Sequence, residues 1–279
     1  METIDAHVHF WRLARGGYGA LDASMAPIFR DREPPHLEAL LQAVGVARII
    51  IVQAAESLAE NLYTLGLAAR FPWIAGVVGW VDPASPSIEE EVSALAAMPG
   101  LKGFRPVRDD NRSIAWMLDA RLDRGWCAIA ARHLTLDILV QNWREIPLAA
   151  YFAARRPDMR IVLDHCGKPD IAGGMFDPWA ESLSELASLP NVFCKLSGLM
   201  NCARPGSGAD ELRPFSDHVL AAFGASRVLW ASDWPPLDLA ADYTTWRRVS
   251  ETLMTKLDGA DRAAVFGGTA ARFYRIAAA

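Results

Sequence analysis

The hydrophobic positions of the chain fall into short runs rich in β-branched residues, and each run precedes a stretch with helical periodicity. The runs begin near residues 3, 47, 72, 101, 134, 160, 191 and 227. Their average spacing is about 32 residues, which is the size of one β-strand followed by its helix. Amphipathic stretches such as 34–46, 87–98 and 145–157 lie between the runs. The pattern therefore predicts eight strands that alternate with helices.

Alternating strands and helices are typical of a parallel sheet. Eight such units in 279 residues favour a single (β/α)₈ barrel, a TIM barrel, over residues 1–279. The alternative is a doubly wound open sheet, but no Gly-x-Gly-x-x-Gly motif follows an early strand. The longest irregular stretch, residues 11–35, would cover the carboxyl ends of the strands, where barrel enzymes have their active sites.

Polar residues interrupt the predicted strands near their carboxyl ends, although barrel strands are buried on both faces and should be apolar. In strand order these interruptions are His7 with His9, Gln53, Asp82, Arg105, Gln141, His165, Ser197 and Asp233. Side chains at these ends would converge on one mouth of the barrel. The sequence therefore predicts a functional site at that mouth.

The first predicted strand alternates ionisable side chains, Asp5, His7 and His9, with the apolar Ile4, Ala6 and Val8. Because successive strand side chains point to opposite faces, we expect the ionisable set to line the barrel and the apolar set to face the helices. Buried imidazoles need partners: a metal ion, a bound anion or hydrogen bonds to each other.

His165 and Asp233 extend the histidine pair of the first strand to three imidazoles and one carboxylate. Such a set suits one zinc-like ion with an open coordination position. The other histidines are expected to be structural, since they fall at a helix start, before the fifth strand and inside a helix: His36, His133 and His218.

Composition narrows the class of protein. The formal charge of −5 argues against a nucleic-acid partner, and no apolar run reaches the roughly 18–20 residues that span a bilayer. No signal peptide is recognisable at the N-terminus. The four cysteines form no Cys-x-x-Cys pair, so we expect reduced thiols. We expect a soluble, cytoplasmic protein that binds a small molecule, and the sequence leaves a homo-oligomer open.

Several motifs in order resemble the amidohydrolase superfamily. They are DAHVHFW, GFRPV, DHCGKPD, KLSGL, ASDWP and FGGTAARFYRI, which together span nearly the whole chain. The wider pattern is similar to the amidohydrolase-related (amidohydrolase 2) branch, which includes sugar-acid and other lactonases. The resemblance implies a (β/α)₈ barrel that hydrolyses an ester or lactone carbonyl in carbohydrate or aromatic catabolism.

The resemblance also implies roles for individual residues. Asp233 would be the general base that takes a proton from the attacking water, with a pKa moved toward neutrality. Arg105 would bind a substrate carboxylate or the polarised carbonyl, beside His7, His9 and His165. The superfamily's binuclear members carry a metal-bridging ligand on strand four and a histidine on strand five. Here those strands offer Arg105 and Gln141.

The cofactor expectation is therefore either no required cofactor or one divalent, zinc-like ion held by His7, His9, His165 and Asp233, without a binuclear centre. Further departures from the pattern are Pro106, where many relatives have a histidine, and Thr269, where asparagine is common. The first of these is expected to affect the substrate and the second only the structure.

Substrate contacts are predicted from the remaining polar and aromatic residues of the mouth: Gln141, Trp11, Trp234, Ser197 and Lys195. The predicted function is the opening of a sugar-acid or carboxylated lactone ring by base-activated water. Two alternatives remain: a metal-dependent decarboxylase of the same superfamily, and a barrel that binds a small molecule without catalysis.

Overall fold

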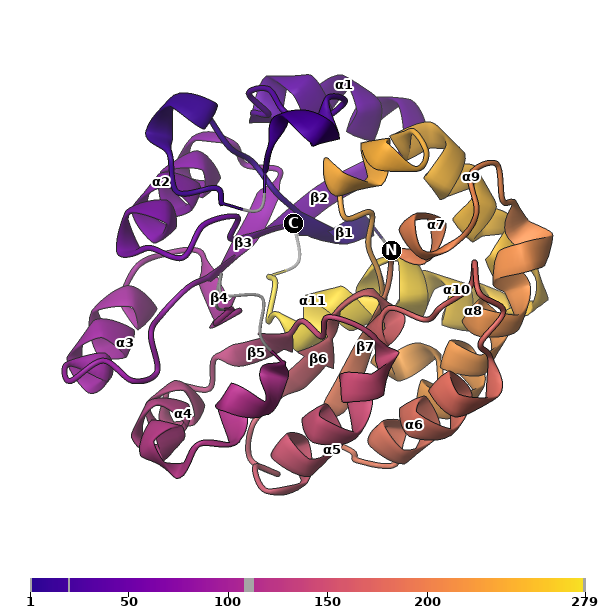
Figure 1. Cartoon of the computed structure of the whole chain (residues 1–279). Helices are drawn as coiled ribbons and strands as arrows, with labels where there is room; N and C mark the ends of the chain where they lie inside the picture. Colours follow the sequence, from indigo (N-terminus) through magenta and orange to yellow (C-terminus); the bar gives the residue numbers. More distant parts are fainter. Residues whose placement is uncertain (1, 20, 108–112, 278–279) are drawn as a thin grey trace.

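The computed structural model describes residues 2–19, 21–107 and 113–277, and its strands follow the predicted alternation (Figure 1). All eight strands form one sheet in chain order, each parallel to the next. The strands are β1 (Thr3–Val8), β2 (Val46–Val52), β3 (Ile74–Gly79), β4 (Leu101–Phe104), β5 (Thr135–Ile138), β6 (Ile161–Leu163), β7 (Val192–Leu196) and β8 (Val228–Trp230). The predicted (β/α)₈ barrel is confirmed.

The barrel closes where the chain beyond β8 meets the end of β1. The backbone N–H of Asp233 donates to His7 O at 3.0 Å, and the N–H of His9 donates to Trp234 O at 2.8 Å. These two bonds continue the parallel pairing past the end of β8. The closure therefore sets Asp233 directly beside the two histidines of the first strand.

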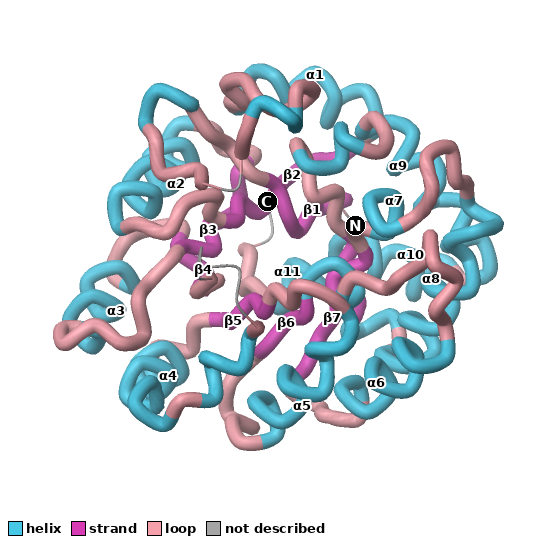
Figure 2. Tube along the Cα trace, in the orientation of Figure 1, coloured by secondary structure: helices cyan, strands magenta, loops and turns pink. Residues whose placement is uncertain are grey.

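Helices surround the strands, with α11 in the middle of the outline rather than in the ring (Figures 1 and 2). They are α1 (Pro34–Val44), α2 (Leu58–Arg70), α3 (Ile88–Ala96), α4 (Asp123–Ala131), α5 (Ile146–Ala154), α6 (Asp177–Ala187), α7 (Leu199–Cys202), α8 (Ala209–Phe223), α9 (Tyr243–Leu253), α10 (Gly259–Ala263) and α11 (Thr269–Phe273). Across the described ranges, no helix is both long and apolar enough to cross a membrane.

Local sequence explains where these helices begin and end. Two prolines open α1, where the missing N–H is not needed, and Gly45 ends it in a left-handed conformation (φ 68°). Ser57 caps α2 by accepting the N–H of Glu60 at 3.1 Å. These signals fix the lengths of the loops that carry the strand ends.

The core has two layers. The larger one lies between the sheet and the helices and includes Val8, Ile49, Ile51 and Leu37. The smaller one joins side chains from several strands to the C-terminal segment: Ile4, Ala6, Ile50, Val52, Val78, Val162, Leu229, Ala231, Ala270, Phe273 and Tyr274. This inner layer fills the barrel below the predicted site.

The predicted facing of the first strand is wrong at its beginning. Ile4 and Ala6 pack inside the barrel, whereas Asp5 points outward and accepts the hydroxyl of Tyr243, on α9, at 2.8 Å. The cause is an irregularity in the β1–β2 pairing between Asp5 and Val8. An extra residue in one strand reverses the facing of everything before it, so only the histidines and Val8 face as expected.

The remaining sequence predictions on histidines and cysteines agree with the structure. His36 lies in the first turn of α1 and accepts the N–H of Glu33, His133 precedes β5, and His218 lies within α8. The four cysteines are free.

Candidate active site

A cavity of about 260 Å³ opens at the carboxyl ends of the strands. Its polar lining consists of His9, Arg105, His165, Lys168 and Asp233. The long loop after β1 covers one side and contributes Trp11, Tyr18 and Leu21. The loop therefore lies over the carboxyl-end face, as the sequence predicted, and the mouth gathers groups from distant parts of the chain.

His7, His9 and Asp233 form the centre of the site. The Nε2 atoms of the two histidines are 3.1 Å apart, and Asp233 Oδ1 lies 3.6 Å from His7 Nε2 and 3.4 Å from His9 Nε2. All three residues are buried, and their ligand atoms are close enough together to hold one metal ion. The closure of the barrel between β1 and β8 produces this arrangement.

The imidazoles of His9 and His165 each have one ring nitrogen fixed by a hydrogen bond. His9 Nδ1 donates to Val52 O at 2.8 Å, which leaves its Nε2 as a lone pair. His165 Nδ1 lies 2.9 Å from Ser197 Oγ, and its Nε2 lies 3.8 Å from Asp233 Oδ2. Ser197 therefore positions a histidine rather than lining the cavity.

His165 is held in an unusual backbone conformation. Its φ is 53°, a left-handed value that costs a non-glycine residue about 1–2 kcal/mol. A Cβ on the neighbouring Gly198 would lie only 2.7 Å from His165 Cβ, so glycine is required there for the ring to fit. Asp233 is also left-handed, with φ 62°. Backbone strain of this kind gathers at functional sites.

The facing imidazoles control the ionisation of Asp233. Burial alone would raise the pKa of its carboxyl, but its interactions with the facing imidazoles, His165 above all, hold this pKa below its ordinary value. Burial lowers the pKa of His165 and, together with the Lys195 charge, that of His7. The expected shift of the Asp233 pKa toward neutrality is wrong, because neighbouring groups outweigh burial.

Beneath the cavity lies a fully buried cluster of charges. Lys195 Nζ lies 2.5 Å from Asp137 Oδ2, 3.0 Å from Asp164 Oδ1 and 2.9 Å from His7 Nδ1. The hydroxyl of Tyr274 donates to Asp137 Oδ2 at 3.0 Å. Lys195 supports the site from below and does not line the cavity.

Arg105 links this cluster to the cavity. Its Nη2 donates to Gln53 O at 2.7 Å, and its Nη1 lies 3.4 Å from Asp164 Oδ2 and 3.3 Å from His7 Nε2. The Gln53 side chain donates to Arg105 O at 2.9 Å. Both polar groups that the sequence singled out on strands two and four thus hold one another at the mouth.

Two predicted substrate contacts lie elsewhere. Gln141 is exposed outside the cavity lining, and its backbone N–H donates to Glu145 Oε2 at 2.7 Å. The Trp234 ring is buried against Phe10 with a centroid separation of 5.9 Å. Trp11 does line the cavity, with Nε1 donating to Arg30 O at 2.8 Å.

Sequence reasoning missed Asp137 and Tyr274. Asp137 carried a usable signal, because an acid inside the apolar run LTLDILVQ needs a buried cation. Tyr274 carried none, since its hydroxyl reaches Asp137 only through the fold of the C-terminal segment.

Tyr18 is fixed in the cavity wall by a buried acid. Its hydroxyl donates to Glu60 Oε2 at 3.3 Å, and the Ala54 N–H donates to Glu60 Oε1 at 3.3 Å. Burial raises the pKa of Glu60 from 4.5 to about 7. An acid with a raised folded-state pKa disfavours folding once it ionises, so this group lowers stability as pH rises from about 4.5 to about 7.

Glu60→Gln tests this pH dependence. We expect the wild-type protein to lose more stability than the variant between pH 5 and pH 7.5, by up to about 2.4 kcal/mol. Urea unfolding at the two pH values measures the difference. The exposed Glu181→Gln serves as the control and should follow the wild type; identical pH profiles for Glu60→Gln and wild type would contradict the assignment.

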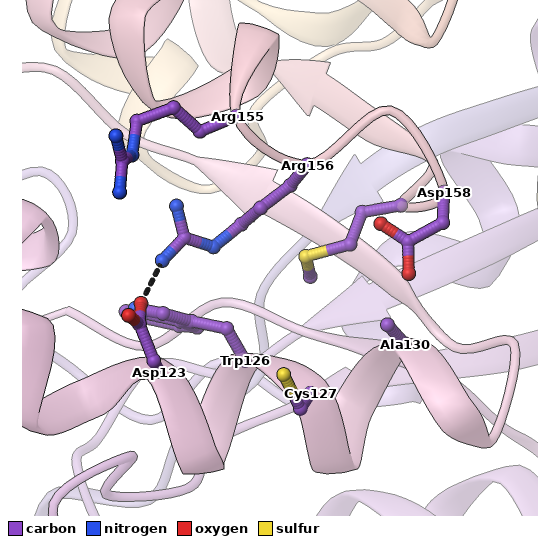
Figure 3. A pocket seen from close by; sticks show the side chains of 8 residues that line it. Asp123, Trp126, Cys127, Ala130, Arg155, Arg156 and Asp158 are labelled. Atoms are coloured by element: carbon purple, nitrogen blue, oxygen red, sulfur yellow. Dashed lines mark hydrogen bonds and ion pairs between the residues drawn. The ribbon is translucent and has the colours of Figure 1, made fainter.

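A second hollow, of about 230 Å³, lies on the flank of the barrel between α4 and residues 155–159 (Figure 3). Arg156 donates to Asp123 Oδ1 there at 2.5 Å, and its guanidinium lies 4.2 Å from the centre of the Phe152 ring. Cys127 and Trp126 project from the same helix (Figure 3). Because this hollow lies away from the carboxyl ends of the strands, we place the functional site in the first cavity.

Fold and site together define a (β/α)₈ barrel of the enzyme type, with imidazoles, a carboxylate and a guanidinium converging at the carboxyl ends of its strands. The chain belongs to the amidohydrolase family, whose model matches residues 4–276. The family resemblance predicted from the motifs is thereby confirmed.

Relatives match over nearly the full length. An L-fucono-1,5-lactonase of Burkholderia ambifaria is 42% identical over 281 residues, covering 98% of this chain and 95% of that protein. A second, from Burkholderia multivorans, is 38% identical over 285 residues, covering 98% and 96%. The crystal structure of a Burkholderia multivorans amidohydrolase with bound zinc is 37% identical, with a TM-score of 0.92 over 99% of this chain and 100% of that one.

Proposed function

We propose that this protein opens the ring of a sugar-acid lactone by hydrolysis. The observation that carries the proposal is the buried carboxylate of Asp233, set among three imidazoles in a cavity walled by Trp11 and Tyr18. The two L-fucono-1,5-lactonases similar to this chain support a sugar 1,5-lactone as the first substrate to test. We further propose a cytoplasmic enzyme, with a homo-oligomer left open.

In the proposed reaction, Asp233 accepts a proton from the attacking water and then returns it to the leaving ring oxygen. Arg105 orients the lactone through its positive charge, while Gln53 and Asp164 hold the guanidinium in place. Ser197 keeps His165 turned toward Asp233. Trp11 offers an apolar face to the sugar ring. Gln141 and Trp234 lie outside the cavity lining and have no role in this reaction.

We propose that one divalent ion fits between His7, His9 and Asp233. Around an ion with ligand bonds of about 2.0–2.1 Å, tetrahedral ligand atoms lie about 3.3–3.4 Å apart. The separations of 3.1, 3.4 and 3.6 Å among His7 Nε2, His9 Nε2 and Asp233 Oδ1 match this geometry. When bound, such an ion would lower the pKa of a water molecule and polarise the carbonyl.

The tautomer of His7 decides between two states of this site. Lys195 donates to His7 Nδ1, so Nε2–H donates to His9 Nε2 and the two rings hold each other. Binding an ion through both Nε2 atoms requires the His7 proton to move from Nε2 to Nδ1. The Nδ1–H can then donate a hydrogen bond to Asp164 Oδ1, which lies 3.4 Å away. His7, Asp164 and His165 form a second close group, but the Lys195 ammonium already contacts two of them. We therefore propose a single ion.

A pH-indicator screen tests the proposed function. We expect hydrolysis of sugar-acid 1,5-lactones, with L-fucono-1,5-lactone among the best, and little turnover of carboxylated aromatic-pathway lactones. Metal analysis should find no more than about one ion per chain. Activity that survives exhaustive chelation would exclude the alternative of an obligatorily metal-dependent decarboxylase. Release of CO₂ from an aromatic acid without lactone hydrolysis would contradict the proposal.

A further inference from the structure

Lys168 is half-buried and differs from the buried cations near the site, Arg105 and Lys195, because its ammonium group is uncommitted. It lines the cavity, and within the described part of the chain no hydrogen bond or ion pair engages its Nζ. Arg105, in contrast, donates to Gln53 O and approaches Asp164. Lys195 is enclosed by Asp137, Asp164 and His7. Lys168 is therefore a cation that a bound ligand can still engage.

A strained turn presents Lys168 to the same cavity as His165. The four residues 165–168 are all left-handed, with φ of 53°, 52°, 68° and 51°, and only Gly167 tolerates this easily. The Lys168 N–H donates to His165 O at 2.8 Å. Trp179 Nε1 donates to Cys166 O at 2.8 Å, and Cys166 Sγ donates to Lys195 O at 3.3 Å. Surrounding structure thus holds a conformation that local energetics disfavour.

The pairing of the charges around the cavity leaves Lys168 and Asp233 outside the two cation–carboxylate pairs. Lys195 pairs with Asp137, and Arg105 with Asp164. Asp233 and Lys168 remain, and both face the cavity. When Asp233 takes a proton from water, its negative charge passes to the substrate, and among the residues that the structure describes Lys168 is then a cation of the cavity lining without a side-chain partner.

We propose that Lys168 is a catalytic residue whose ammonium group stabilises the oxyanion formed from the lactone carbonyl. This inference rests on the proposed lactone hydrolysis. The water oxygen bonds to the carbonyl carbon, the π electron pair of the C=O bond moves onto its oxygen, and the water proton goes to Asp233. The pair then returns, the ring C–O bond breaks, and the ring oxygen leaves with the proton from Asp233.

Lys168 donates to the carbonyl oxygen throughout these steps and binds it most strongly when it carries the full charge. An interaction that strengthens in the transition state raises kcat rather than lowering KM. Removing one donor to an oxyanion costs roughly 10²–10³-fold in kcat. The product acid then ionises, and its carboxylate is expected to contact the same ammonium group.

Lys168→Gly is the informative variant, because a left-handed φ of 51° suits glycine and should preserve the fold. We expect kcat for the best sugar-acid lactone to fall roughly 10²-fold or more, with KM within about threefold. Added ethylammonium should restore part of the rate that Lys168→Gly loses. The variant Lys168→Arg should keep a higher kcat than Lys168→Gly. Inhibition by the aldonate product should weaken. The control is Lys102→Met, at the amino end of β4, which should stay within about twofold of wild type in kcat.

Other outcomes separate the two proposals. Suppose that the wild type hydrolyses lactones and that Lys168→Gly keeps kcat within about threefold of it, whether or not KM rises. The proposed role of Lys168 is then overturned, and the proposed lactone hydrolysis is upheld. A folded Lys168→Gly protein whose lost rate neither ethylammonium nor arginine restores also overturns it. If the wild type hydrolyses no lactone, the proposed function and this inference fail together.

Discussion

Asp233→Asn is expected to lower kcat/KM for lactone hydrolysis by roughly 10²–10⁴-fold, the usual contribution of a general base. The amide has almost the shape of the carboxylate but cannot accept the proton of the attacking water. Because Asp233 N–H still donates to His7 O, the backbone closure of the barrel is kept. Initial rates in a pH-indicator assay, together with the unfolding midpoint, measure both effects.

The matched control is Asp217→Asn on α8, where the carboxylate pairs with Lys256 at 2.8 Å, far from the strand ends. It should remain within about twofold of wild type, since surface ion pairs contribute at most about 1 kcal/mol to stability. A fall of less than about tenfold in Asp233→Asn would remove Asp233 from the role of base and leave water activation to one of the imidazoles.

The regular spacing of the apolar runs along the sequence was sufficient to predict the barrel, because each strand of a parallel sheet is a short apolar run separated from the next by a helix. The predicted beginnings near residues 47, 101 and 191 lie within one residue of β2, β4 and β7. The facing of β1 could not be predicted, because a single extra residue in its pairing with β2 turns Ile4 and Ala6 inward. Such an irregularity depends on the neighbouring strand and leaves no mark in the alternation itself.

The candidate site was predictable where a polar residue stood alone at the end of an apolar run. His7, His9, Arg105, His165 and Asp233 meet that description, and the structure brings them together around one cavity. Gln141 meets it too but lies outside, since the chain turns outward after β5. Lys168 and Tyr18 lie on loops, and their inward direction comes from a left-handed turn and from a buried acid that periodicity does not reveal.

The buried ammonium group of Lys195 should matter most for stability. Lys195→Met leaves Asp137 and Asp164 without their shared cation in the barrel interior, where all three side chains are inaccessible to water. Removing one partner from a buried ion pair costs about 3–5 kcal/mol, because the other charge stays buried without compensation. Urea unfolding is expected to show a loss of that size, and Lys102→Met at the barrel's amino end should lose much less.

The pairing itself can be separated from the loss of a large side chain. Adding Asp137→Leu to Lys195→Met removes the uncompensated acid, so the double variant should be more stable than Lys195→Met alone, by more than about 1 kcal/mol. Arg105 remains near Asp164 in both variants, at 3.4 Å. A double variant that is less stable than Lys195→Met would mean that packing, rather than charge, accounts for the loss.

The loss of Lys195 also removes the hydrogen-bond donor at His7 Nδ1. The His7 proton should then move more freely between its two ring nitrogens, which makes the ion-binding state of the histidine pair easier to reach.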